Sequence, residues 1–273
     1  MDKITIPALA EMKKTGRKSV GVVAWDYQIA TIADRIGVDL VVVGDSVGVN
    51  LWGHATPFEV TMDEMIVVGK AVRRGVKRAL VSCDFPFGPL QEGTASAVRA
   101  AIRLVKEAGA DLVKLDGAAD YPDAVTAIEK AGIPVFAQFG LTPQLALRHG
   151  IDYRSLSSSQ VPDEITNQLV TDAKRLEEAG ASLLDFTNSG PTAGAEVAKA
   201  VSIPVLGGFG GGPWLDGRVR MAHAAIGYAA SSIDNPPDTY ANVAATTFEA
   251  LGAYADDVRA GKQIRGGVPW PRP

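Results

Sequence analysis

The sequence has a single cysteine, no long apolar run and no excess of positive charge. Because Cys83 stands alone among 273 residues, no disulfide can form within the chain, which argues against an extracellular disulfide scaffold. No apolar stretch approaches the roughly 20 residues that span a bilayer, and the first residues lack the basic start and apolar segment of a signal peptide. We therefore expect a cytoplasmic protein without a membrane partner.

Charge and histidine content narrow the function classes further. The formal charge is −4 at pH 7 and no basic stripe interleaved with aromatic residues is present, so nucleic acid is not an expected partner. The histidines, His54, His149 and His223, lack metal-ligand spacing, and no serine–histidine–acid triad is suggested. Apolar residues make up 47% of the chain, which is ample for a buried core.

Short β-rich runs alternate with longer amphipathic stretches along the chain. The predicted strands are Val20–Ala24, Leu40–Gly44, Ala79–Asp84, Leu112–Asp116, Pro134–Phe139, Ser182–Thr187 and Pro204–Gly207, with a weaker eighth near Ile226–Ala230. Helical patterns lie between them, among them residues 94–108, 124–131, 164–179 and 192–200. Repeated strand–helix units predict a parallel sheet. Because roughly eight units follow one another without a break in composition, we expect closure into a (β/α)8 TIM barrel.

The chain is predicted to be one domain over residues 1–273. Residues 1–18 carry a short helical pattern, from Ala8 to Lys14, and are expected to cap the barrel. Residues 238–260 have the pattern of a C-terminal helix, and residues 262–273 that of an irregular tail. The polar, serine-rich stretch 148–162 is long for a connection and is expected to be a lid or a binding loop.

Three acidic residues stand at the downstream ends of three predicted strands. They are Asp45, Asp84 and Asp116, and the carboxyl ends of barrel strands share one rim, where barrel enzymes keep their active sites. Converging carboxylates repel one another in a partly desolvated cleft, which favours a bound divalent cation such as Mg²⁺. Asp45 and the neighbouring Ser46 are also ordinary turn and cap residues, so taken alone they indicate only a capped turn.

Strand periodicity places further polar residues on the same face as these acids. In the strand 112–116, Lys114 and Asp116 point together, either as part of a site or as an ion pair inside the barrel mouth. By the same alternation Asp185 lies on one face with Thr187, and Gln138 with Phe136. The glycine-rich run 207–212 is consistent with phosphate binding or with a tight, close-packed turn.

The chain resembles the ketopantoate hydroxymethyltransferase (3-methyl-2-oxobutanoate hydroxymethyltransferase) family of the phosphoenolpyruvate mutase and isocitrate lyase superfamily. The resemblance extends to about residue 260 and rests on Ala24-Trp-Asp-Tyr27, Val43-Gly-Asp-Ser-Val-Gly48, Gly53-His54, Ala71-Val-Arg-Arg-Gly75, Asp84-Phe-Pro-Phe87, Val113-Lys-Leu-Asp-Gly117 and Gly140-Leu-Thr-Pro-Gln144.

This resemblance implies a chemistry and a set of roles. Mg²⁺ would be bound by Asp45, Asp84 and Asp116, the last of which is usually a glutamate in the family. Ser46 and Lys114 would hold the carboxylate and keto oxygen of a 2-oxo acid. A metal-stabilised enolate of that acid would attack a one-carbon unit from 5,10-methylenetetrahydrofolate. The resemblance also implies a homo-oligomer.

Two departures from the family pattern concern proton transfer. Gln138 stands where the family usually has a histidine, and Thr187 stands at or near the glutamate expected to be the base. Neither side chain takes up a proton near neutral pH. Asp185, two residues before Thr187, is either a replacement base or a residue that bonds within the barrel.

Three functional hypotheses follow from these observations. The first is a Mg²⁺-dependent enzyme that makes or breaks a C–C bond beside the carbonyl of a 2-oxo acid, most concretely a hydroxymethyltransferase with an altered substrate or acid–base residues. The second is a lyase or mutase reaction on a related oxo acid without folate. The third is a catalytically inactive barrel that binds a metabolite.

Overall fold

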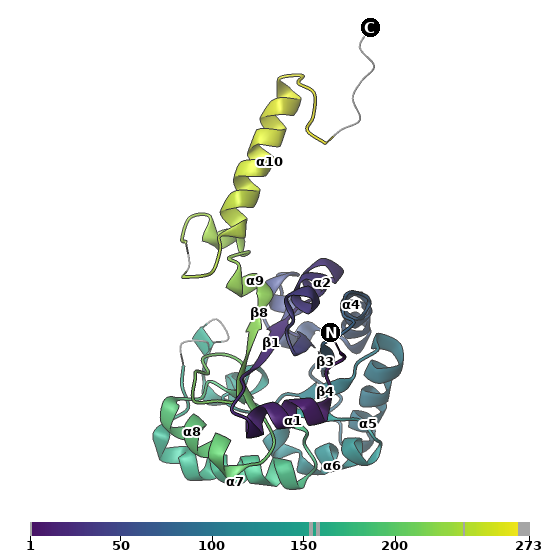
Figure 1. The fold of residues 1–273 in the computed structure, drawn as a ribbon, viewed down its shortest axis with the longest axis vertical. Coiled ribbons are helices and arrows are strands. Elements are labelled where there is room, and N and C mark those ends of the chain that lie inside the picture. Colours follow the sequence, from purple (N-terminus) through teal and green to yellow (C-terminus); the bar gives the residue numbers. More distant parts are fainter. Residues whose placement is uncertain (1, 153–154, 157–158, 237, 267–273) are drawn as a thin grey trace. The chain divides into compact units, whose positions relative to one another are not determined.

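The computed structural model describes residues 2–152, 155–156, 159–236 and 238–266 (Figure 1). Eight parallel strands close into a barrel in the order of the sequence. They are β1 (Ser19–Val23), β2 (Leu40–Val43), β3 (Leu80–Asp84), β4 (Leu112–Leu115), β5 (Val135–Gly140), β6 (Leu183–Thr187), β7 (Val205–Gly207) and β8 (Gly217–Met221). The prediction of a (β/α)8 TIM barrel is confirmed.

Helices connect the strands, as Figure 1 shows. The α-helices are α1 (Ile6–Lys14), α2 (Tyr27–Ile36), α3 (Val47–Asn50), α4 (Met62–Gly75), α5 (Thr94–Arg103), α6 (Pro122–Lys130), α7 (Thr166–Glu178), α8 (Pro191–Ala200), α9 (Ala222–Ala225) and α10 (Val243–Arg259). A π-helical turn, η2 (Leu104–Ala108), continues α5, and short 3₁₀ turns η1 (Pro57–Glu59), η3 (Ala118–Asp120), η4 (Pro143–Leu145), η5 (Leu147–His149), η7 (Asp163–Ile165) and η8 (Ala230–Ser232) lie in the loops.

The predicted position of the eighth strand is wrong. Residues 226–230 follow α9 and lead into η8, whereas β8 runs from Gly217 to Met221. β8 alternates Arg218 and Arg220 with Gly217, Val219 and Met221, so it lacks the mostly apolar composition that predicts the other strands. Gly217 is the first residue of β8. A Cβ there would lie 2.3 Å from the carbonyl oxygen of Ser19 in β1. Only glycine allows the two strands to close the barrel at this point.

The N-terminal segment lies against the amino ends of the last strands. Lys13, in α1, donates a hydrogen bond to the carbonyl of Ile203, just before β7, and forms a 2.9 Å ion pair with Asp216, just before β8. α1 begins two residues earlier than predicted because the Thr5 side chain accepts a hydrogen bond from the Ala8 backbone. These contacts place α1 beside the starts of β7 and β8, and the role of residues 1–18 as a cap stays a prediction.

The chain divides into two compact units, residues 1–220 and 221–273. The first holds α1 to α8 and nearly all of the barrel, and the second holds α9, η8 and α10. α10 begins later than residue 238 because Asn242 caps it, with its side chain accepting from the Ala245 backbone. A single domain over 1–273 therefore stays a prediction, and of the predicted tail 262–273 only residues 262–266 are described.

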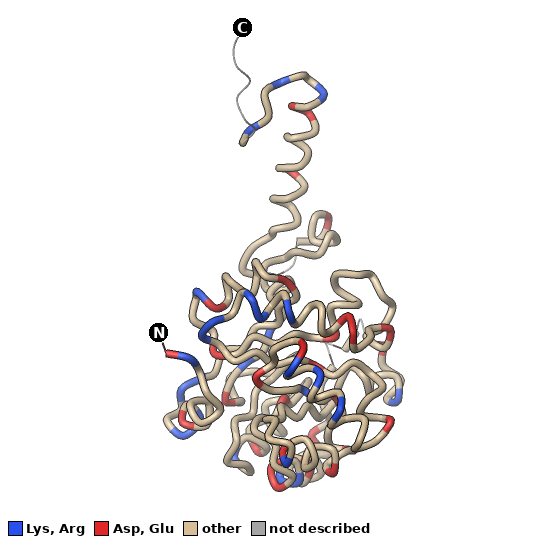
Figure 2. Tube along the Cα trace, turned by 90° about the vertical axis from the view of Figure 1, so that its right-hand side faces the viewer, with Lys and Arg blue, Asp and Glu red and all other residues tan. Residues whose placement is uncertain are grey.

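The described residues contain no membrane-spanning helix and no tract of charges of one sign (Figure 2). Within these residues no helix combines the length and hydropathy of a membrane span. Figure 2 shows acidic and basic residues interspersed over the first unit without a tract of either sign. This agrees with the absence of a basic stripe in the sequence.

The outer face of the barrel packs closely against its helices, which yields a first testable prediction. A Cβ at Gly69, in α4, would lie 2.7 Å from the Ala108 Cβ and 3.4 Å from the Cys83 sulfur, so the lone cysteine faces the helices. We expect Gly69→Ala to lower the free energy of unfolding by about 1–3 kcal/mol through overpacking. Urea denaturation measures this change.

Gly252→Ala is the matched control for that substitution. Gly252 also lies within a helix, α10, but a Cβ there would meet nothing within 4 Å. Replacing it should stabilise the protein by roughly 0.5–1 kcal/mol, because alanine has the higher helix propensity. A Gly69→Ala protein that is as stable as the wild type would contradict close packing between α4 and η2.

Candidate active site

The polar residues singled out from the sequence meet at the carboxyl ends of the strands. Asp45 follows β2, Asp84 ends β3, Lys114 lies in β4 with Asp116 after it, Gln138 lies in β5, and Asp185 and Thr187 lie in β6. The strand registers pair Asp84 with Lys114 and Gln138 with Asp185. All seven residues are more than nine-tenths buried. The alternation deduced from the sequence therefore assigned the inward face correctly.

Lys114 lies at the centre of a buried polar network that also contains Asp84, Gln138, Asp185 and Thr187. Its Nζ donates to Gln138 Oε1 at 2.5 Å and lies 3.3 Å from Asp84 Oδ2 and 3.3 Å from Asp185 Oδ2. Burial lowers the pKa of Lys114, but the carboxylates of Asp84 and Asp185 outweigh that effect and hold the pKa above its ordinary value. Lys114 is therefore a charged donor at neutral pH.

Asp185 and Thr187 complete the network on β6. The Asp185 Oδ1 accepts from the Gly208 backbone at 2.8 Å, while its Oδ2 faces Lys114, so both carboxylate oxygens are engaged. Gln138 Nε2 donates to Thr187 Oγ1 at 2.8 Å. Because lysine only donates, Gln138 must turn its oxygen toward Lys114 and its nitrogen toward Thr187.

The remaining carboxylates are crowded and poorly compensated. Burial raises the pKa of Asp45 to about 6, with the charge of Asp116 adding to the effect. Burial likewise raises the pKa of Asp84 to about 7, against the influence of Lys114, and that of Asp116 to about 6. Asp84 Oδ1 and Asp116 Oδ1 are fully buried and have no hydrogen-bond partner among the described residues. Such orphaned acceptors are costly unless a ligand satisfies them.

These orphaned oxygens fit a hard divalent cation, although the acids do not form a closed cage. Among the residues described, no group of three or more His, Cys, Asp and Glu side chains is disposed to surround one metal ion. Mg²⁺ does not need such a cage, because it usually keeps several waters and binds through one or two carboxylates plus substrate oxygens. The donor set of Asp84 and Asp116, with Asp45 as a charged neighbour, is of this kind.

Gln144, in η4, ends the motif Gly140-Leu-Thr-Pro-Gln144, and the sequence alone predicts no role for its side chain. Its side-chain Nε2 donates to Asp45 Oδ2 at 3.1 Å, and its backbone N–H donates to Asp116 Oδ2 at 3.1 Å. No periodic signal could have found it, because it lies in a loop rather than on a strand face. The one hint was its position, five residues after Phe139, the end of the fifth predicted strand.

Other sequence candidates lie outside this network. Ser46 precedes α3 at the N-cap position but makes no side-chain capping hydrogen bond, and a Cβ on Gly44 would lie 2.8 Å from its Oγ, so the hydroxyl points back toward Gly44. No hydrogen bond joins it to Lys114 among the described residues. In the glycine-rich run, a Cβ on Gly207 would lie 3.1 Å from the Gly211 Cα, which is the tight, close-packed turn.

The loop 148–162 reaches the carboxyl end of β6 at its far end. The Val161 backbone donates to the carbonyl of Asn188, one residue beyond β6, at 3.0 Å. Residues 153–154 and 157–158 of this loop lie outside the described residues. Its role as a lid or binding loop stays a prediction.

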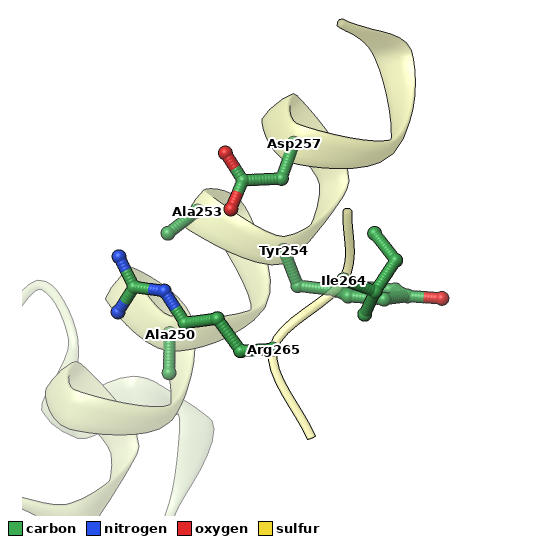
Figure 3. A pocket seen from close by; sticks show the side chains of 6 residues that line it. All are labelled: Ala250, Ala253, Tyr254, Asp257, Ile264 and Arg265. Atoms are coloured by element: carbon green, nitrogen blue, oxygen red, sulfur yellow. The ribbon is translucent and has the colours of Figure 1, made fainter. Parts of the chain in front are cut away.

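A pocket of about 250 Å³ lies in the second unit and contains none of the network residues. α10 and residues 264–265 line it with Ala250, Ala253, Tyr254, Asp257, Ile264 and Arg265 (Figure 3). Its polar side chains are Asp257 and Tyr254 on the mostly exposed α10 and Arg265 in the segment that follows the helix. It lacks the buried, convergent polar groups of the barrel mouth.

Comparison with known proteins agrees with this geometry. The family model described as ketopantoate hydroxymethyltransferase matches residues 3–263. The 3-methyl-2-oxobutanoate hydroxymethyltransferase of Salinibacter ruber is 39% identical over 259 residues, covering 95% of this chain and 96% of the relative. That of Pyrococcus furiosus is 39% identical over 271 residues, covering 96% and 90%.

Solved structures with much lower identity share the fold. Phosphonopyruvate hydrolase in complex with oxalate and Mg²⁺ has a TM-score of 0.57 at 14% identity, covering 99% of this chain and 92% of that chain. 2,3-Dimethylmalate lyase, a member of the phosphoenolpyruvate mutase and isocitrate lyase superfamily, has a TM-score of 0.58 at 13% identity, covering 98% and 99%. The family model and the two hydroxymethyltransferases match this chain over nearly its whole length. The chain therefore belongs to the ketopantoate hydroxymethyltransferase family.

Proposed function

We propose that this member of the family is a Mg²⁺-dependent enzyme that forms or breaks a C–C bond beside the carbonyl of a 2-oxo acid. The observation that carries the proposal is the pair of orphaned, buried carboxylate oxygens, Asp84 Oδ1 and Asp116 Oδ1, beside the charged Lys114. Hydroxymethyl transfer from 5,10-methylenetetrahydrofolate to an oxo acid is the most concrete form of this reaction.

In this proposal Asp84 and Asp116 hold the metal, and Asp45 adds negative charge beside them. When bound, Mg²⁺ supplies Lewis-acid polarisation of the substrate's keto oxygen. Lys114 donates to the anionic end of the substrate, and Gln138 fixes the direction in which that donor points. Buried charge-assisted hydrogen bonds of this kind are strong and orient their ligands.

The proton-transfer groups of this chain differ from those expected of the family. Gln138 and Thr187 accept and donate hydrogen bonds but do not take up a proton near neutral pH. Asp185 is the remaining acid of the network, yet both of its oxygens are engaged. We therefore assign Asp185 to balancing the charge of Lys114 rather than to proton abstraction, and expect the substrate or the electrophile to differ from those of the relatives.

The test is solvent deuterium exchange at the carbon beside the carbonyl, followed by NMR. Branched and unbranched 2-oxo acids are incubated in D₂O with Mg²⁺ or with a chelator. We expect exchange with at least one acid, dependent on Mg²⁺ and lost in Asp84→Asn. Asp120→Asn is the matched control, because Asp120 is half exposed and pairs with Arg148 away from the network.

The outcomes separate the three functional hypotheses. Product formation that requires methylenetetrahydrofolate supports the hydroxymethyltransferase, and turnover without it supports a lyase or mutase reaction. The absence of exchange with every acid would favour the inactive, metabolite-binding barrel. The inactive barrel is favoured by Gln138 and Thr187, which stand where the family has proton-transfer residues. The retained Lys114 network argues against it, because buried charges are costly to keep. A homo-oligomer remains expected from the family.

A further inference from the structure

Gln144 connects the ends of three strands across the barrel mouth. Besides its bonds to Asp45 and Asp116, its Nε2 lies 3.4 Å from the carbonyl oxygen of Phe85, the residue after β3. The side chain is 9% exposed, so these bonds are largely shielded from water. One residue of the β5 loop thus contacts the regions that follow β2, β3 and β4.

The local backbone explains how a loop residue reaches this position. Gly140, at the end of β5, has φ +90°, and a Cβ there would lie 2.8 Å from the Thr187 carbonyl oxygen. The chain therefore turns sharply where no other residue fits without strain. Pro143 then starts η4 with a fixed φ, which aims the backbone N–H of Gln144 at Asp116.

The hydrogen bonds of Gln144 leave specific oxygens free. It occupies Oδ2 of Asp116, and Oδ1 of the same carboxylate is one of the orphaned buried acceptors. Both donors are neutral, the side-chain amide to Asp45 and the backbone N–H to Asp116, so they hold the two carboxylates without cancelling their attraction for a cation. A lysine or arginine side chain at this position could also donate to Asp45 but would repel a metal ion.

We propose that Gln144 is a positioning residue of the Mg²⁺ site: its side chain orients Asp45, whose charge attracts the cation, and its backbone N–H orients Asp116, which holds it. This inference rests on the metal site of the proposed function. Residues that orient metal ligands typically change metal affinity by about 10–100-fold when they are replaced.

The experiment measures Mg²⁺ binding to the substrate-free protein by titration calorimetry. Gln144→Met keeps the side-chain length and the backbone donor but removes the amide. We expect its Kd for Mg²⁺ to rise by about 10–100-fold. Gln168→Met is the matched control, because Gln168 also donates to an aspartate, Asp172, but on the exposed surface of α7. Its affinity should equal that of the wild type.

A second measurement needs no variant and so does not depend on folding. In ¹⁵N-labelled wild-type protein, the side-chain amide resonances of Gln144 should shift as Mg²⁺ is added, while those of Gln168 stay in place. Wild-type affinity in Gln144→Met, or unmoved Gln144 resonances at saturating Mg²⁺, would overturn the positioning role. If the wild type binds no Mg²⁺ at all, the proposed metal site itself fails, which is a separate result.

Discussion

Lys114→Met is expected to destabilise the protein by about 3–5 kcal/mol at neutral pH, the usual cost of removing one partner from a buried ion pair. Asp84 and Asp185 would both lose the cation that lies 3.3 Å from their carboxylates. Gln138 would lose the donor that fixes its orientation. Urea denaturation monitored by circular dichroism measures the change.

The same substitution should lower the rate of Mg²⁺-dependent deuterium exchange by about 10²–10³-fold, as for other single donors to a developing negative charge. Lys199→Met is the control, since Lys199 pairs with Glu196 on the exposed face of α8. That surface pair should be worth less than about 1 kcal/mol. A Lys114→Met protein with wild-type stability would show that the buried carboxylates are not charged in the way the network requires.

A double variant separates the roles of Asp185. If Asp185 only balances Lys114, then Asp185→Asn combined with Lys114→Met should recover part of the lost stability, because the uncompensated charge is gone. Asp185→Asn alone should then retain exchange activity at a reduced level. Complete loss of exchange in Asp185→Asn, with Mg²⁺ affinity and stability unchanged, would instead restore its candidacy as the base.

The sequence was sufficient for the barrel and for the inward face of its mouth. Seven strands are mostly apolar and lie within a residue or two of their predicted bounds, because the largely buried strands of a parallel barrel admit few polar residues. The position of β8 could not be predicted, because Arg218 and Arg220 interrupt its apolar pattern. The inward placement of Lys114 and Asp185 followed from simple alternation along β4 and β6.

Roles that depend on distances across the mouth could not be obtained from the sequence. Asp185 could be read as a base or as an internal partner until the positions of Lys114 and the Gly208 N–H were known. Gln144 owes its role to a turn set by Gly140 and to the convergence of three other strand ends. Neither set of contacts produces a periodic pattern in the sequence, so sequence patterns alone cannot assign roles to Asp185 and Gln144.

The buried acids make the stability of the metal-free protein depend on pH. The pKa of Asp84 rises to about 7 and those of Asp45 and Asp116 to about 6, from an ordinary value of 3.8. Because the folded state holds these protons more tightly than the unfolded state, the contribution of these groups is fully present below about pH 4 and is lost as pH rises through 6 to 7. Without Mg²⁺, stability should therefore fall between about pH 4 and pH 7.

Asp45→Asn should remove part of that loss. Asparagine keeps an oxygen to accept from Gln144 but carries no charge next to Asp116. With a chelator present at pH 8, we expect the variant to be about 1–3 kcal/mol more stable than the wild type, since one pKa unit is worth about 1.4 kcal/mol. At pH 4 the two proteins should differ little, because Asp45 is then protonated in the folded state.

With Mg²⁺ present at pH 8, the wild type should become more stable than Asp45→Asn. Protons compete with the metal for the same carboxylates, so the stabilisation by Mg²⁺ should be larger at pH 8 than at pH 5 in the wild type. At 100 times its Kd, a ligand bound only by the folded state contributes about 2.7 kcal/mol. Asp45→Asn should gain much less, because the charge that favours the cation is gone, and thermal denaturation with and without Mg²⁺ at the two pH values measures both effects. Equal gains at pH 5 and pH 8, or an unchanged pH profile in Asp45→Asn, would mean that these carboxylates do not form the cation site.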